Sequence, residues 1–240
     1  MNTVFISDLH LAENQPVIAD IFLRFLQREA RSAGSLYILG DFFEAWVGDD
    51  DLTAFHLVII AALRAATESG LPIYLMHGNR DFLLGRRFLN ATGCRLLPDE
   101  YVLNLVNGPV LLMHGDTLCT ADTAYLKFRK KSRNWFMQKL FLCKSLAKRQ
   151  AIAARMREQS KLHTSNAPEY LMDVTQAEVE RVMAKHQVKK LIHGHTHRPA
   201  VHEFSLGDMA VTRTVLPAWH EKGNMLVVGA DGLQESVDLY

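Results

Sequence analysis

The stretch FISDLHL, residues 5–11, places a carboxylate and an imidazole directly after an apolar run. Asp8 and His10 flank Leu9, so in extended backbone their side chains point to the same face. Two donors on one face are suited to holding a common ligand. A polar turn after a buried strand has the same local sequence, so the rest of the chain has to decide between these interpretations.

Short apolar runs alternate with helical patterns along the chain. The apolar runs are TVFIS (3–7), SLYILG (35–40), PIYLMHG (72–78), PVLLMHG (109–115) and KKLIHG (189–194), followed by shorter pieces at 211–216 and 224–230. Near-continuous apolar strands of this kind are typical of a sheet covered on both faces. Helical spacing of apolar residues marks the ranges 16–34, 51–70 and 175–187. This alternation predicts an α/β layered domain.

Residues 120–166 break this rhythm, because they show only helical patterns. Phe136, Leu140 and Cys143 follow the i, i+4, i+7 spacing of one helix face. Twelve of the 27 Lys and Arg residues lie between positions 127 and 161, where Glu158 is the only acidic residue. Such asymmetry indicates an anionic partner, with a solvated basic helix face as the alternative. We expect one domain over 1–240 that carries a helical insertion at 120–166.

Length and composition bound the class of protein. The 240 residues are 48% hydrophobic, which suffices for a sizeable buried core. We find no basic and apolar leader, and no apolar run near the roughly 20 residues that span a bilayer. Cys94, Cys119 and Cys143 are odd in number and widely spaced. They predict reduced thiols in a cytoplasmic protein.

Potential ligands follow five of the apolar runs, nearly always beside a glycine. They are Asp8, His10, Asp41, Asn79, His114, His195 and His197. Binding sites in open α/β sheets form outside the carboxyl ends of strands. Three oxygen donors and four imidazoles are more ligands than one ordinary closed metal site takes. They fit two divalent cations that share a bridging carboxylate. Ligation by imidazole, carboxylate and amide groups together favours Mn²⁺, Fe²⁺ or Zn²⁺ over Ca²⁺. The histidines left as structural are His77, His163, His186 and His202.

The order of these motifs resembles a known family. D-x-H, G-D, G-N-x-D and G-H-x-H form the signature of the calcineurin-like metallophosphoesterases. The segments LYILGDFFEAWVGDDD (36–51), HGNRDFLLG (77–85), LLMHGDTLCTAD (111–122) and LIHGHTHRPAVH (191–202) are similar, more narrowly, to the pyrophosphohydrolases of UDP-2,3-diacylglucosamine in the lipid A pathway. This resemblance covers residues 1 to about 220. It implies a four-layer αββα sandwich with a helical cap that receives acyl chains.

The resemblance also implies roles for the candidate ligands. Asp8, His10 and His197 would hold the first metal, with Mn²⁺ as the implied ion. The second metal would be held by Asn79, His114 and His195, with Asp41 bridging the pair. We expect Asp81 and Asp116 to accept the other ring N–H of ligand histidines, an arrangement that fixes the tautomer.

The implied reaction cleaves UDP-2,3-diacylglucosamine to UMP and 2,3-diacylglucosamine 1-phosphate, with water attacking the uridine-side phosphorus. Asn79, Arg80 and His195 are the predicted catalytic and substrate-binding residues; Arg80 is placed to clamp a phosphoryl oxygen, or else forms a surface salt bridge. Further implied sugar and phosphate contacts are Asp122, Tyr125, Arg157, Ser160 and Thr164. Ala167 stands where the family often has a basic residue, which puts the contacts of that turn in doubt.

The helical insertion would serve the acyl chains, since each buried CH₂ contributes about 0.8 kcal/mol. Candidates for the acyl groove are Trp46, Phe82, Leu84, Phe128, Phe141, Ile152 and Met156, each of which could instead be plain core packing. The basic face would lie against anionic phospholipid on the cytoplasmic side of a Gram-negative inner membrane. We expect no nucleic acid and no obligate protein partner.

Two alternatives remain open from the sequence. One is the same two-metal chemistry on another substrate, as in a nucleotide diphosphatase, another phosphodiesterase, a phosphoprotein phosphatase or a nuclease. A nuclease would use the basic segment for phosphates. Single-strand binders, however, interleave exposed aromatic residues, and the aromatic spacing here predicts core-facing side chains. The other alternative is a non-catalytic scaffold, which would typically have lost ligands, whereas all seven residue types are present.

Overall fold

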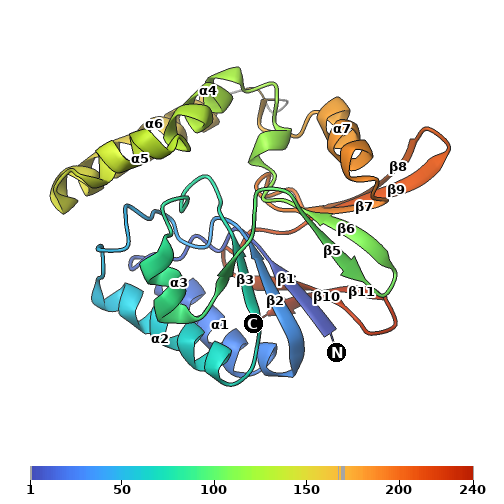
Figure 1. The fold of residues 1–240 in the computed structure, drawn as a ribbon, viewed down its shortest axis with the longest axis horizontal. Helices are drawn as coiled ribbons and strands as arrows, with labels where there is room; N and C mark the ends of the chain where they lie inside the picture. Colours follow the sequence, from blue (N-terminus) through green and yellow to red (C-terminus); the bar gives the residue numbers. More distant parts are fainter. Residues whose placement is uncertain (1, 167, 169–170, 240) are drawn as a thin grey trace.

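The computed structural model describes residues 2–166, 168 and 171–239, with the side chains of 161 and 163–166 outside this description. Two β-sheets pack face to face and carry helices on their outer surfaces (Figure 1). From one outer surface to the other, the layers are helix, sheet, sheet and helix. The predicted αββα sandwich is therefore confirmed.

The first sheet has six strands in the order β11-β10-β1-β2-β3-β4. Their bounds are β1 Asn2–Ile6, β2 Ala33–Leu39, β3 Ile73–Met76, β4 Arg95–Leu96, β10 Gly223–Val228 and β11 Gln234–Leu239. Strands β1 to β4 run parallel, and β10 runs antiparallel to both of its neighbours, β1 and β11. The carboxyl ends of β1, β2 and β3 consequently lie at the same edge.

The second sheet has five strands in the order β5-β6-β7-β9-β8. Their bounds are β5 Tyr101–Leu105, β6 Gly108–Leu112, β7 Lys190–His193, β8 Ala200–Leu206 and β9 Met209–Val215. β6, β7 and β9 run parallel to one another. The chain thus enters the second sheet at β5 and returns to the first at β10.

The two-residue period of the strands divides the core into three layers. In β2, Leu36 and Ile38 pack toward helices α1 (Pro16–Gln27), α2 (Ala54–Glu68) and α3 (Arg86–Thr92), while Tyr37 and Leu39 pack between the sheets. On the other side, Leu191 of β7 packs against α7 (Gln176–His186). Each central strand is therefore apolar on both faces, which explains the continuous apolar runs in the sequence.

Several elements differ from the sequence-based expectation. The helix expected over 16–34 ends at Gln27, and β2 already begins at Ala33. The sequence patterns missed α3, β4, β5, β8 and β11. Strands β8 and β11 are edge strands with mostly exposed side chains, so they lack the apolar run by which the central strands were recognised.

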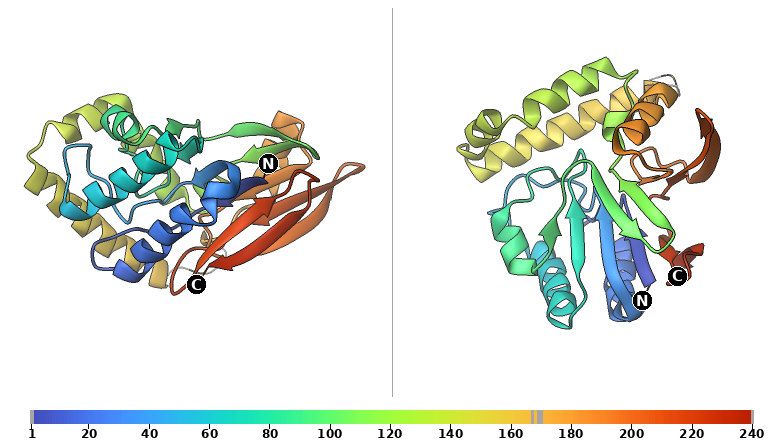
Figure 2. Two further views of the ribbon diagram at one scale, coloured as in Figure 1. Left: turned by 90° about the horizontal axis from the view of Figure 1, so that it is seen from below. Right: turned by 45° about the vertical axis from the view of Figure 1, so that its right-hand side comes forward.

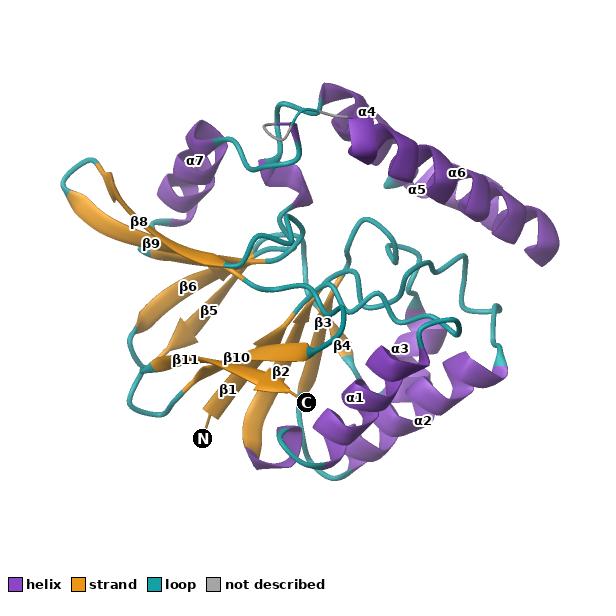
Figure 3. Cartoon of the chain, turned by 180° about the vertical axis from the view of Figure 1, so that it is seen from behind, coloured by secondary structure: helices purple, strands orange, loops and turns teal. Residues whose placement is uncertain are grey.

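Helices α4 (Thr123–Ser132), α5 (Trp135–Leu142) and α6 (Leu146–Asn166) fill most of the expected helical segment. Figures 2 and 3 show them as a layer of their own, with the loops that leave the strands gathered beneath. Neither α4 nor α5 has a buried residue. The expectation of core-facing aromatics is wrong, since Trp135 and Phe136 are 69% and 59% exposed. Within the described residues, no helix combines the length and apolar composition of a membrane-spanning segment.

Candidate metal centre

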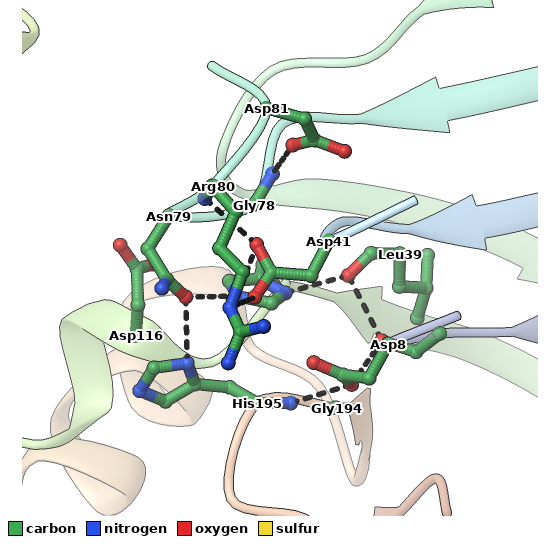
Figure 4. A network of polar contacts seen from close by, with 12 residues as sticks. Asp8, Leu39, Asp41, Gly78, Asn79, Arg80, Asp81, Asp116, Gly194 and His195 are labelled. Carbon is green, nitrogen blue, oxygen red and sulfur yellow. Dashed lines mark hydrogen bonds and ion pairs between the residues drawn. The ribbon is translucent and has the colours of Figure 1, made fainter. Parts of the chain in front are cut away.

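Backbone hydrogen bonds bring the loops after five strands to one place. The loop after β1 is tied to the loop after β2, because the Asp8 amide donates to the Gly40 carbonyl at 3.1 Å. The Gly194 amide, after β7, donates to the His114 carbonyl, after β6, at 2.9 Å. The His195 amide then reaches the Asp8 carboxylate at 2.8 Å, joining the two sheets (Figure 4). The loop after β3 joins them through the Arg80 carbonyl, which accepts from the Trp46 amide at 3.2 Å, and all seven predicted ligands belong to these five loops.

Asp8, His10 and His197 form a first cluster whose donor atoms lie within 4.8 Å of one another. The Nε2 atoms of His10 and His197 are 3.2 Å apart, and His197 Nε2 is 3.4 Å from Asp8 Oδ1. Buried Asp8 Oδ1 and His10 Nδ1 have no hydrogen-bond partner. Unpaired buried polar atoms are costly, so this donor set fits a cation.

Asp8, Asp41 and His114 form a second cluster within the same limit. The Leu39 carbonyl accepts from His114 Nδ1 at 2.8 Å, so Nε2 is the ring nitrogen that is available to a metal. That atom is 2.9 Å from Asn79 Oδ1 and 3.8 Å from Asp41 Oδ1, both of them acceptors. Three lone pairs that converge in this way also fit a divalent cation.

His195 approaches the same place from the loop after β7. Its Nδ1 lies 3.0 Å from Asn79 Oδ1, and its ring lies 5.0 Å from that of His114. Asp8 belongs to both clusters, whereas the family resemblance implied Asp41 as the bridging ligand. The structure thus brings together the seven predicted residues in two adjoining groups.

Backbone strain is concentrated at the same residues. Among the described residues, six that are not glycine have positive φ, and five of these are predicted ligands: Asp8, His10, Asp41, His195 and His197. Such conformations cost about 1–3 kcal/mol each and cluster at functional sites. A Cβ on Gly78 would lie 2.1 Å from the Asp41 backbone nitrogen, which explains the glycine before Asn79.

Residues 1–199 match the family model described as calcineurin-like phosphoesterase. This chain belongs to that family. A Serratia proteamaculans protein named UDP-2,3-diacylglucosamine hydrolase is 51% identical over 234 residues, covering 98% of each chain. An Escherichia coli O7:K1 protein of the same name is 53% identical over the same coverage.

Electrostatics of the phosphoesterase site follow from its burial. Burial alone would raise the pKa of Asp8, but the hydrogen bond to His197 and the charge of His114 bring it well below its usual value. Burial raises the pKa of Asp41, although His114 and Arg80 act in the opposite direction. Burial, together with the charge of His114, lowers the pKa of His195 to about 4. Burial would lower the pKa of His114, but the carboxylates of Asp41, Asp8 and Asp116 raise it above its usual value. A metal that binds there would have to displace this proton.

Arg80 points into this phosphoesterase site. Its backbone amide donates to Asp41 Oδ1 at 2.9 Å, and its Nε lies 3.4 Å from Asp41 Oδ2. Its Nη1 pairs with Glu44, which also accepts from Arg157 Nε of α6 at 3.0 Å. Glu44 thus connects the helical layer to the site, and its Oε2 is 3.6 Å from His10 Nδ1. Sequence reasoning missed Glu44, because nothing in its local pattern distinguishes it from a surface acid.

The expected role of Asp81 and Asp116 is wrong. Asp81 is fully buried and accepts from the backbone amides of Phe42 and Gly78, each at 2.7 Å. Asp116 accepts from Tyr125 Oη at 2.5 Å and from Arg129 Nε at 2.6 Å. These carboxylates therefore hold the backbone and helix α4, and no described hydrogen bond joins them to a histidine ring N–H.

The other predicted substrate contacts lie on the helical layer. Asp122 caps α4 by accepting from the Tyr125 amide at 2.8 Å. Ser160 is exposed on α6. The Thr164 side chain and the whole of Ala167 lie outside the described residues, so those two predictions stay predictions.

The acyl-groove candidates fall into three groups by exposure. Trp46 and Leu84 are each 3% exposed and belong to the core under α1 to α3. Phe82 is half-buried beneath the Arg133 guanidinium, 5.0 Å from its ring centroid. The remaining four lie on the helical layer: Phe141 and Ile152 are half-buried, whereas Phe128 and Met156 are 37% and 38% exposed. Trp46 and Leu84 thus have the packing of core residues, the alternative that the sequence left open.

Proposed function

We propose that this chain hydrolyses the pyrophosphate bond of UDP-2,3-diacylglucosamine, giving UMP and 2,3-diacylglucosamine 1-phosphate. The observation that carries this proposal is the 51% and 53% identity to hydrolases of that name, which extends over 98% of the chain and includes the helical layer. The reaction belongs to the lipid A pathway. Water attacks the uridine-side phosphorus, and no side chain acts as nucleophile.

We propose that two divalent cations, both of them Mn²⁺, complete the site. Asp8, His10 and His197 would hold one, and Asn79, His114 and His195 the other, with Asp41 between them. When bound, the pair neutralises the diphosphate and acidifies a water molecule. The support is the donor chemistry together with the unpartnered Asp8 Oδ1 and His10 Nδ1.

The chain's own side chains then orient the substrate. Arg80 and Arg157 approach from the core and from α6, and both reach Glu44. Two guanidinium groups on opposite sides of one carboxylate can grip the oxygens of a diphosphate once it enters. We propose His195 and His114, whose rings both lie beside Asn79, as the two candidates for proton transfer at the leaving oxygen.

The helical layer supplies the lipid selectivity. Its exposed apolar side chains suit acyl chains, and its basic residues suit an anionic membrane surface at about 1 kcal/mol per well-placed Lys or Arg. We propose that it docks the chain on the cytoplasmic side of the inner membrane and receives the substrate there.

Turnover of the diacylated UDP-sugar, compared with that of UDP-N-acetylglucosamine, tests the substrate. We expect strong preference for the diacylated compound; equal rates would favour a nucleotide diphosphatase of broader range. Reaction in ¹⁸O-water should place the label in UMP, and label in the sugar phosphate would contradict attack at the uridine-side phosphorus. Asp41→Asn should abolish turnover while the circular dichroism spectrum stays unchanged.

A further inference from the structure

A small cavity of about 220 Å³ lies on the outer face of the five-stranded sheet. Arg213 of β9 lines it, opposite His202 of β8 in the strand register. Arg213 shares the face of Val211, two residues earlier, which packs against α7. The loop after β7 closes the cavity with Thr196 and Arg198. No residue assigned to metal binding lines it, although Thr196 lies between two of them.

The Arg213 residue is largely buried, and the carboxylate of Asp173, which lines the same cavity, acts on its charge from beyond ion-pair distance. Its side chain is 6% exposed, and its buried Nε has no hydrogen-bond partner. Nη1 donates to His193 Nε2 at 3.1 Å. Because His193 Nδ1 donates to the Gly194 carbonyl at 2.8 Å, His193 is a neutral ring that balances no charge. Among the described residues, no carboxylate oxygen lies within ion-pair distance of Arg213.

Among the described residues that line the cavity, Asp173 is the carboxylate, and both of its oxygens contact other groups. Asp173 Oδ1 accepts from the Val174 amide at 2.7 Å, and Oδ2 faces Arg198 Nη1 at 3.4 Å. The hydroxyl of Thr196, also lining the cavity, is buried without a partner. The lining therefore offers the Arg213 Nε–H and the Thr196 hydroxyl, two buried donors that lack an acceptor.

An uncompensated buried ion costs several kcal/mol. A buried water would satisfy the two donors but would leave the charge unbalanced. A small anion satisfies both requirements at once. We propose that this cavity is a binding site for a small tetrahedral oxyanion such as inorganic phosphate, held by Arg213 and Thr196. Such an ion braces the loop that carries His195 and His197.

Equilibrium dialysis of the full chain against radiolabelled inorganic phosphate tests the proposal. The metal-loaded protein and the chelator-treated protein are compared, since phosphate at the metal centre leaves with the metals. We expect chelator-treated protein to retain one phosphate per chain, displaced by sulfate and not by chloride. Arg213→Met should lose this phosphate, whereas Arg86→Met, an exposed arginine on α3, should keep it.

The design separates this site from the metal centre. Absence of chelator-resistant phosphate, or retention of it in Arg213→Met, would overturn the proposal. If metal-loaded protein binds no more phosphate than chelator-treated protein does, the result would instead count against the proposed hydrolase site. If Arg213→Met does not fold, Arg213→Lys keeps the charge but loses the planar fork, and weaker binding is expected. Crystals soaked in tungstate should show an anomalous peak beside Arg213, and an empty cavity there would refute the assignment.

Discussion

Asp81→Asn should destabilise the chain far more than its conservative chemistry suggests. The buried Asp81 carboxylate accepts from the Phe42 and Gly78 amides at 2.7 Å each, with a longer contact of 3.4 Å to the Phe43 amide. These bonds tie the loop after β2 to the loop after β3. An asparagine keeps one acceptor oxygen but turns an NH₂ group toward the other backbone amide.

The magnitude follows from the two short bonds. A hydrogen bond to a charged group contributes about 1.5–3 kcal/mol, and an unpaired buried N–H costs about 1–3 kcal/mol. We therefore expect Asp81→Asn to lower the free energy of unfolding by about 3 kcal/mol. Asp99→Asn is the matched control, because Asp99 is 48% exposed and pairs with Arg129 on the surface. That control should lose only about 0–1 kcal/mol.

Urea denaturation followed by circular dichroism measures both variants. The midpoint should fall for Asp81→Asn without a change in the slope m. The assay uses chelator-treated protein, so that altered metal affinity does not enter the comparison. If Asp81→Asn is as stable as Asp99→Asn, then Asp81 does not hold the loops together and the account given for it fails.

Three further outcomes are expected. Among the three cysteines, only exposed Cys143 should react quickly with a thiol reagent in the folded protein. Burial raises the pKa of Cys94 to about 11 and that of Cys119 to about 12, which keeps both thiols protonated. Rapid labelling of all three cysteines would contradict this. Replacing Trp135 and Phe136 by serine should weaken sedimentation with phosphatidylglycerol vesicles at least tenfold, because each buried aromatic contributes about 1.5–3 kcal/mol; unchanged sedimentation would exclude α5 as the docking face. Chelation should stop turnover and added Mn²⁺ should restore it, whereas activity that survives chelation would rule out a metal-dependent reaction.

Sequence reasoning was most successful where the chain itself carries a repeating signal. The central strands are apolar on both faces, and each ends in a glycine or a polar residue, so their positions and the loops after them were predictable. Edge strands β8 and β11 have mostly exposed side chains and join their sheets through backbone hydrogen bonds. No local sequence pattern therefore revealed them. Trp135 and Phe136 of α5 face solvent, because the helical layer does not close over them.

The sequence by itself predicted which residues carry the candidate donor atoms, because parallel strands must deliver their carboxyl ends to one edge and the candidates follow those ends. Only the tertiary structure decided how the donors are partnered. Asp8 is shared by both clusters, Glu44 joins Arg80 to Arg157, and Asp81 holds backbone amides. Each of these contacts joins loops far apart along the chain, and their geometry is set by the packing of two sheets, which no local pattern of residues encodes.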